Sequence, residues 1–96
     1  QKPMADVRAC YYFRFAALDR PGVLSRISGI LGKHDISISA VIQKGREVAG
    51  AVPIVMITHE ALERHVREAL DEIDRLDVLR APTRLIRIES ALEAAR

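Results

Sequence analysis

The sequence predicts a small α+β domain in which a four-stranded antiparallel sheet carries two helices on one face. Three observations lead to this fold class. Segments of strand and helix character follow one another in the order strand, helix, strand, strand, helix, strand. Each helical segment has a single apolar stripe, so each helix must cover a sheet face. The connections are short, which places both helices on the same side of the sheet.

Composition limits the classes of protein to consider. At 96 residues, with 49% hydrophobic and 29% charged residues, the chain suits one globular domain with a single core. The 15 basic and 13 acidic residues are interspersed, which does not indicate a nucleic-acid partner. The longest uncharged apolar run, 52–57, is too short to span a membrane. Cys10 is the only cysteine, so no internal disulfide can form, which is consistent with a cytoplasmic protein.

The first strand is expected over residues 10–18, which contain all the aromatic residues of the chain. Its alternation places one set of side chains on the core face: Tyr11, Phe13, Phe15 and Ala17. The first helix is expected from Pro21 to about Leu31, with Gly32 as the stop signal. Its apolar residues share an arc of about 120°: Val23, Leu24, Ile27, Ile30 and Leu31.

Residues 36–43 alternate between apolar and more polar side chains and predict the second strand. The side chains expected to face the core are Ile36, Ile38, Ala40 and Ile42. A hairpin loop is expected at 45–50, followed by a third strand at 52–58 that is apolar on both faces. Such a strand belongs in the middle of a sheet. The second strand then lies at an edge, and neither Pro nor Lys protects residues 36–42 from pairing with another chain.

The second helix is expected over residues 60–75, with Thr58 as its cap and ion pairs such as Glu63–Arg67 on its exposed side. Its apolar stripe is Leu62, Val66, Ala69, Leu70, Ile73 and Leu76. A last strand within 78–89 contains Pro82, which is typical of an edge strand. This order of elements is that of the ferredoxin-like βαββαβ sandwich.

The turn at residues 18–24 is the strongest candidate binding site. Pro21 is expected to preset the first helical φ, and Gly22 keeps side chains away from the backbone. The first N–H groups of a helix lack internal partners and lie at the positive end of the helix dipole. Such a position suits a carboxylate or a phosphate, although a turn of this kind is also common without a ligand.

Other kinds of site find little support. A phosphate loop is excluded because Ile27 stands where the first glycine should be and no Ser or Thr follows Lys33. His59 and His65 point about 120° apart around a helix, so they do not form a metal site. The third strand has no aromatic residue for stacking RNA bases, and one cysteine cannot make the Cys-x-x-Cys of a metal chaperone. No catalytic constellation is apparent.

The strings 19–24 (DRPGVL) and 34–38 (HDISI) resemble those of ACT domains, small modules that bind amino acids and regulate metabolic enzymes. The longer strings 33–45, 52–59 and 84–89 resemble the C-terminal ACT domains of homoserine dehydrogenases. The likeness extends over roughly residues 9 to 89. It implies an ACT regulatory domain at 9–90, between a linker at 1–8 and a tail at 91–96. It also implies a parent enzyme that uses NAD(P), whereas this fragment itself would be neither catalytic nor cofactor-binding.

The resemblance also implies a ligand site. Asp19 takes the place from which many ACT domains contact the amino group of the ligand, and the amides of Gly22, Val23 and Leu24 would face its carboxylate. The neighbouring Arg20 belongs to the same loop, and threonine is the first candidate ligand. The family pattern brings Ser37 and Ile38 to this pocket from a second subunit of a homo-oligomer. Some ACT domains serve only assembly, and that alternative stays open here.

Overall fold

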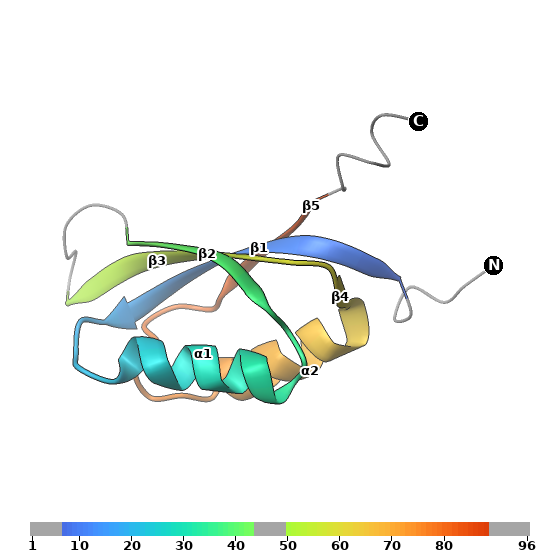
Figure 1. Cartoon of the computed structure of the whole chain (residues 1–96). Coiled ribbons are helices and arrows are strands. Elements are labelled where there is room, and N and C mark those ends of the chain that lie inside the picture. The colour runs from blue at the N-terminus through green and yellow to red at the C-terminus, as the bar shows by residue number, and fades with distance from the viewer. Residues whose placement is uncertain (1–6, 44–49, 89–96) are drawn as a thin grey trace.

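A computed structural model describes residues 7–43 and 50–88, and the elements follow the predicted order with one addition. They are β1 (Arg8–Leu18), α1 (Val23–Lys33), β2 (Ile38–Gln43), β3 (Ala51–Thr58), β4 (Ala61–Leu62), α2 (Glu63–Asp74) and β5 (Arg84–Ile88). Both helices lie on one face of the sheet, and no described helix covers the other face (Figure 1). The predicted ferredoxin-like α+β class is confirmed.

The sheet is antiparallel throughout, with β1 between β3 and β5 and with β2 at the edge beside β3. The first and third predicted strands are therefore central, as expected. The addition is β4, whose Ala61 pairs with Ala9 at the start of β1. β3 and β4 pair with the same edge of β1, and the two residues 59–60 separate them. The described sheet thus has five strands rather than four, and β4 occupies residues that were assigned to the start of the second helix.

The core lies between the sheet and the helices, and its centre is the odd-numbered side of β1. Tyr11, Phe13, Phe15 and Ala17 are each 1% exposed or less, as the alternation predicts. The ring centroid of Phe13 lies 6.4 Å from that of Tyr11 and 5.8 Å from that of Phe15. Each large apolar side chain buried in this layer stabilises the fold by about 1.5–3 kcal/mol.

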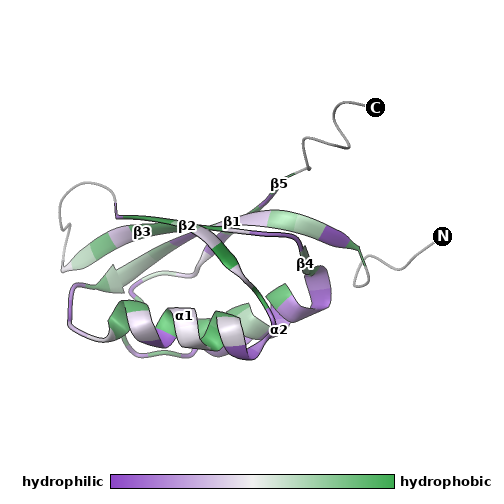
Figure 2. Ribbon diagram, in the orientation of Figure 1, coloured by the Kyte–Doolittle hydropathy of each residue, from purple (hydrophilic) through white to green (hydrophobic). Residues whose placement is uncertain are grey.

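Each helix buries one face against this layer. Figure 2 shows hydrophobic and hydrophilic residues alternating along both helices, as amphipathic helices require. The apolar residues that the helices bury all belong to the predicted stripes: Val23, Ile27, Leu31, Val66, Ala69 and Ile73. The structure has no described helix long and apolar enough to cross a membrane.

The end of α1 differs from the prediction, because Gly32 lies inside the helix and does not stop it. The helix ends at Lys33 and is closed by a Schellman motif with Asp35 in the left-handed region at φ 66°. The Asp35 amide donates to the Gly32 carbonyl at 3.0 Å, and the Ile36 amide donates to the Leu31 carbonyl at 2.9 Å. Ile36 and Leu31 are both buried, and they occupy the two positions at which Schellman motifs commonly have an apolar pair.

The predicted cap of the second helix is wrong, because α2 begins at Glu63 and its N-cap, Leu62, makes no side-chain cap hydrogen bond. Thr58 remains in β3, where its hydroxyl oxygen accepts a hydrogen bond from the Tyr11 amide at 3.0 Å. This bond satisfies a backbone donor of β1 near the break between β3 and β4. Thr58 therefore stabilises the sheet rather than the helix.

The predicted alternation of the second strand is also wrong in its second half. Ile38 pairs with Thr58 on the helix side, but the register shifts by one before Ala40, which pairs with Ile57. Directly opposite residues of antiparallel strands share a face, and Ile57 belongs to the face without helices. The bulge therefore turns Ala40 and Ile42 away from the core, and Ile42 is 42% exposed.

The C-terminal segment forms a shorter strand than predicted. β5 contains five residues and pairs with β1 at an edge of the described sheet. Val78 is buried, and Leu79 forms an isolated bridge with Ala17, so residues near 78 meet the end of β1 before β5 begins. The predicted linker at 1–8 and tail at 91–96 lie almost wholly outside the described residues.

Candidate functional site

The turn between β1 and α1 contains most of the predicted site residues. Arg20–Val23 form a turn in which the Val23 amide donates to the Arg20 carbonyl at 3.3 Å. Gly22 has φ 86° and ψ −12°, the values of the third residue of a type II turn, where glycine is favoured. Pro21 occupies the second position of this turn, and the expectation that it opens the helix is wrong. A Cβ on Gly22 would meet no atom within 4 Å, so the backbone angle rather than space requires glycine.

The N-terminus of α1 offers some but not all of the predicted amides. Gly22 is the N-cap, and its carbonyl accepts the first helical hydrogen bond, from Arg26, at 2.9 Å. The Val23 amide is used inside the turn. Within the described residues, the amides of Gly22 and Leu24 donate no hydrogen bond, and no side chain caps the helix. Two of the three predicted amides are therefore available to an anion.

The side chains of the turn face solvent. Asp19 and Arg20 are exposed, and the Asp19 carboxylate has no hydrogen-bond or ion-pair partner in the part of the chain that the structure describes. The strand that leads into the turn is held firmly, because the Leu18 amide donates to the Val78 carbonyl at 2.9 Å. The geometry thus combines a fixed backbone, free amides and one carboxylate that can pair with an ammonium group.

The chain enters β2 at the far end of α1 from this turn (Figure 1), and Ser37 and Ile38 are the residues at that entry. The helix has eleven residues, so about 16 Å of helix separates its two ends. Ser37 is exposed, and its carbonyl accepts a hydrogen bond from the His59 amide at 2.9 Å. Ile38 begins β2 at the edge of the sheet. One copy of the chain therefore does not bring all the predicted site residues together, and a shared pocket needs a second copy.

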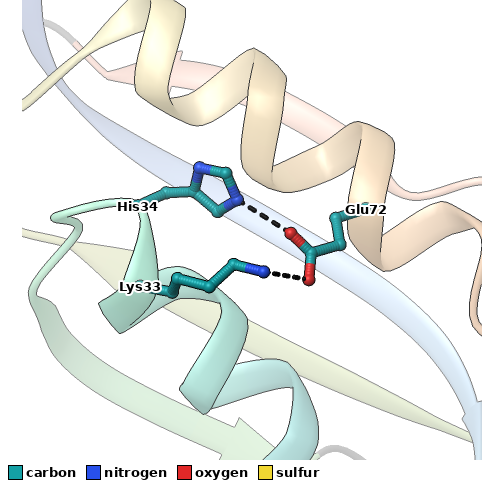
Figure 3. Close-up of polar contacts among 3 residues, drawn as sticks. All are labelled: Lys33, His34 and Glu72. Carbon is teal, nitrogen blue, oxygen red and sulfur yellow. Dashed lines mark hydrogen bonds and ion pairs between the residues drawn. The ribbon is translucent and has the colours of Figure 1, made fainter.

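A polar contact joins the two helices, and nothing in the sequence pattern predicts it. Figure 3 shows Lys33 and His34, at the end of α1, both directed at the carboxylate of Glu72 on α2. Lys33 Nζ lies 2.7 Å from Glu72 Oε2, and His34 Nε2 lies 2.9 Å from Oε1. The hydrogen bond from Lys33, followed by that from His34, lowers the pKa of Glu72. Lys33 and His34 are 39 and 38 residues from Glu72 in the sequence, so no local pattern predicts this contact.

A second missed contact lies under β1. The Tyr11 hydroxyl donates to Glu63 Oε1 at 3.2 Å, and the other carboxylate oxygen accepts from Arg67 at 3.1 Å. Burial, and then the charge of Glu63, raises the pKa of Tyr11. Glu63 is 8% exposed, so it is a buried partner rather than the surface residue that was expected. No group of three or more His, Cys, Asp and Glu residues within 7–43 and 50–88 is arranged to hold a metal ion.

Comparisons with known proteins agree with this architecture. A curated homoserine dehydrogenase of Neisseria gonorrhoeae is 39% identical over 88 residues, which cover 92% of this chain and 20% of that protein. One from Pseudomonas aeruginosa is 34% identical over 91 residues, which cover 91% of this chain and 21% of that protein. The chain thus spans about a fifth of the length of the curated relatives it matches.

Solved structures give the same picture. The crystal structure of a homoserine dehydrogenase from Thiobacillus denitrificans superposes with a TM-score of 0.84 at 40% identity, covering 93% of this chain and 19% of that chain. The ACT domain from GTP pyrophosphokinase of Chlorobium tepidum has a TM-score of 0.65 at 12% identity, which supports the fold alone. The family model named ACT domain matches residues 11–78. This chain belongs to the ACT domain family.

Proposed function

We propose that this chain is the regulatory domain of a homoserine dehydrogenase and that it binds an amino acid, with threonine the first candidate, to control that enzyme. The parent would interconvert aspartate semialdehyde and homoserine with NAD(P), in the cytoplasm. The identity of about 40% to homoserine dehydrogenases supports this parent. The catalytic and cofactor-binding residues are expected in the parts of such enzymes that this chain does not span.

The observation that carries the ligand proposal is the pair of free amides at the exposed N-terminus of α1. The amides of Gly22 and Leu24 would donate to the carboxylate of the amino acid, aided by the positive end of the helix dipole. The exposed carboxylate of Asp19 would accept from its ammonium group. Arg20 adds a positive charge beside the carboxylate end of the ligand.

A second copy would complete the pocket. Ser37 and Ile38 lie too far from the turn of their own chain, so we expect them to approach the turn of a partner. The edge strand β2 is the natural place for this pairing, because it exposes Val41 and Ile42 and has β3 as its only neighbour among the described strands. A ligand that needs both copies stabilises the dimer, and the dimer raises its affinity.

A purely structural role is the second candidate. Its specific support is that the Val23 amide is already used inside the turn, which leaves fewer donors than the ligand proposal first required. In that case β2 still pairs two copies, but the turn stays empty. The two candidates differ in a single observable, the response of the domain to free amino acids.

A thermal-shift series distinguishes them. With threonine at 100 times its Kd, the domain should gain about 2.7 kcal/mol of stability, which corresponds to a rise in Tm of roughly 10 °C for a domain of this size. Isoleucine, methionine and lysine serve as comparison ligands. Asp19→Ala should remove the shift, whereas Asp71→Ala, which deletes an exposed carboxylate on α2, should retain it. Equal melting temperatures with and without each amino acid would leave only the structural role.

A further inference from the structure

The face of the sheet that no described helix covers contains two arginines directly opposite each other. Arg14 of β1 pairs with Arg84 of β5, and both side chains are exposed. They share this face because Phe13 and Phe15, the neighbours of Arg14 along β1, point into the core. Like charges placed directly opposite across two strands destabilise a sheet. The arrangement therefore stores a repulsion that a bound anion would relieve.

Nothing in the described structure neutralises this pair. Neither the Arg14 nor the Arg84 side chain has an ion-pair or hydrogen-bond partner among residues 7–43 and 50–88. By contrast, Arg67 on α2 lies 3.1 Å from a carboxylate oxygen of Glu63. The two guanidinium groups of the open face are thus a concentrated positive charge with free donors, and guanidinium donors match the geometry of a carboxylate well.

Two hollows flank the arginine pair, and both arginines line each of them. One hollow has a volume of about 140 Å³ and is otherwise lined by apolar residues that include Pro53, Ala81 and Pro82. The other measures about 180 Å³ and is lined by Tyr12 and Ile86. An apolar cavity of about 150 Å³ is large enough to hold a benzene molecule. Each hollow therefore offers room for one small apolar group beside the paired charges.

We propose that Arg14 and Arg84 bind the carboxylate of a small apolar acid, whose hydrocarbon group occupies the hollow beside Pro53 and Pro82. A carboxylate fits better than a phosphate, because the remaining walls offer few donors to a third anionic oxygen. A second copy of the chain does not fit face to face, since it would bring four guanidinium groups together. The site lies on the sheet face opposite the helices, so it is separate from the amino-acid site proposed at the turn.

Phenylacetate is a suitable probe, and NMR titration of the chain with ¹⁵N-labelled arginine side chains and labelled alanine methyl groups measures its binding. A ligand of this size should bind with a Kd on the order of 1 mM. Saturable shifts are expected at the Nε–H groups of Arg14 and Arg84 and at the methyl group of Ala81, which lines the hollow beside Pro53 and Pro82. 2-Phenylethanol, which lacks the charge, and acetate, which lacks the ring, should each bind at least tenfold more weakly.

Matched variants locate the site. Arg84→Gln should weaken phenylacetate binding at least tenfold, and Arg75→Gln, which removes an exposed arginine at the end of α2, should not change it. Asp19→Ala should also leave it unchanged, so failure of the amino-acid proposal and failure of this one are distinguishable. The proposal is overturned by shifts that do not saturate, by equal affinities in Arg84→Gln and the unmodified chain, or by shifts confined to the turn around Gly22.

Discussion

The hydroxyl of Tyr11 donates a hydrogen bond to the carboxylate of Glu63 across the interface between β1 and the first turn of α2. The donor and acceptor atoms are 3.2 Å apart, and both residues are buried. The same carboxylate pairs with Arg67 one turn further along the helix. A buried charge costs stability unless it is paired and hydrogen-bonded, so this arrangement allows Glu63 to lie under the sheet. It also fixes how α2 sits against β1.

Removal of the Tyr11 hydroxyl should therefore destabilise the fold. Tyr11→Phe leaves one oxygen of a buried carboxylate without its donor, which should cost about 1–3 kcal/mol. Tyr12→Phe is the matched control, because the Tyr12 hydroxyl has no hydrogen-bond partner among the described residues. That control should change the free energy of unfolding by less than about 0.5 kcal/mol. Urea denaturation of both variants measures the difference, and equal costs would contradict a specific role for the Tyr11–Glu63 bond.

The same contact predicts a loss of stability in alkali. Burial, followed by the charge of Glu63, raises the pKa of Tyr11 above its ordinary value of 10.0. A group whose pKa is raised by folding contributes stability below its unfolded pKa, and this contribution disappears as the pH rises through the folded value. The Tm should therefore fall above about pH 10, and Tyr11→Phe should flatten that part of the curve. An identical alkaline profile in the variant would mean that other groups cause the fall.

The contact between the helices predicts a second pH dependence, with the opposite sign. The pKa of Glu72 is lowered from 4.5, first by the hydrogen bond from Lys33 and then by that from His34. Its contribution to stability is present above the unfolded pKa and disappears as the pH falls through the lower folded value. Glu72→Gln should thus lower the Tm near neutral pH, and its effect should disappear once the pH falls below the folded-state pKa of Glu72. Glu68→Gln, an exposed neighbour on α2, should give a curve parallel to that of the unmodified chain.

Much of the fold was predictable because the spacing of apolar residues along the sequence shows which side of each strand and helix is buried. The odd positions of β1 are aromatic or small and apolar, and the two helix stripes each fill one arc, so the faces that form the core could be assigned without coordinates. The position of the turn was predictable for a similar reason, since a Pro–Gly pair between a strand and a helix has few alternatives. Gly22 and Pro21 do form that turn, although the helix starts after them.

The remaining features depend on partners that are distant in the sequence. The alternation of residues 36–43 predicts one unbroken register, and only pairing with β3 introduces the bulge that turns Ile42 outward. Thr58 is a residue type that often caps helices, but its hydroxyl oxygen accepts a hydrogen bond from the Tyr11 amide instead. For the candidate site, the sequence located the turn, whereas the loss of the Val23 amide to the Arg20 carbonyl followed only from the backbone angles.

The bulge in β2 makes a direct prediction for two isoleucines that the sequence treats as equivalent. Ile38 packs against the core, whereas Ile42 lies on the open face and is 42% exposed. Ile38→Ala should cost about 1–3 kcal/mol of stability, and Ile42→Ala less than about 0.5 kcal/mol. Chemical denaturation at low protein concentration avoids any contribution from assembly. An equal loss of stability in the two variants would indicate that the alternation continues along this strand without the bulge.

Substitutions at Gly22 can separate two effects on stability, that of the positive backbone angle φ and that of the space around the turn. Gly22→Ala adds a Cβ that meets no atom, so its cost should come from the left-handed backbone alone, at about 1–2 kcal/mol. Gly22→Asn should cost less despite its larger side chain, because asparagine tolerates this conformation. The order of the two melting temperatures is the measurement. If the asparagine variant melted below the alanine variant, space around the turn rather than φ would be the limiting factor.

The proposed assembly through β2 can be tested by placing a charge on its exposed edge. Val41→Lys should raise the dimer dissociation constant at least tenfold, because pairing would bring two lysines together at the seam. Ile86→Lys, on β5 at the other edge, exchanges a still more exposed residue and should leave assembly unchanged. Sedimentation equilibrium measures both variants.

The same variant tests whether the ligand site is shared. Because Ser37 and Ile38 of one copy would complete the turn of the other, threonine should tighten the dimer of the unmodified chain and should bind poorly to Val41→Lys at concentrations where that variant is monomeric. Ligand affinity should then recover as the protein concentration rises, since binding and dimerisation are linked. A monomeric Val41→Lys that binds threonine with undiminished affinity would mean that the turn of a single copy, with Asp19 and its free amides, holds the ligand alone.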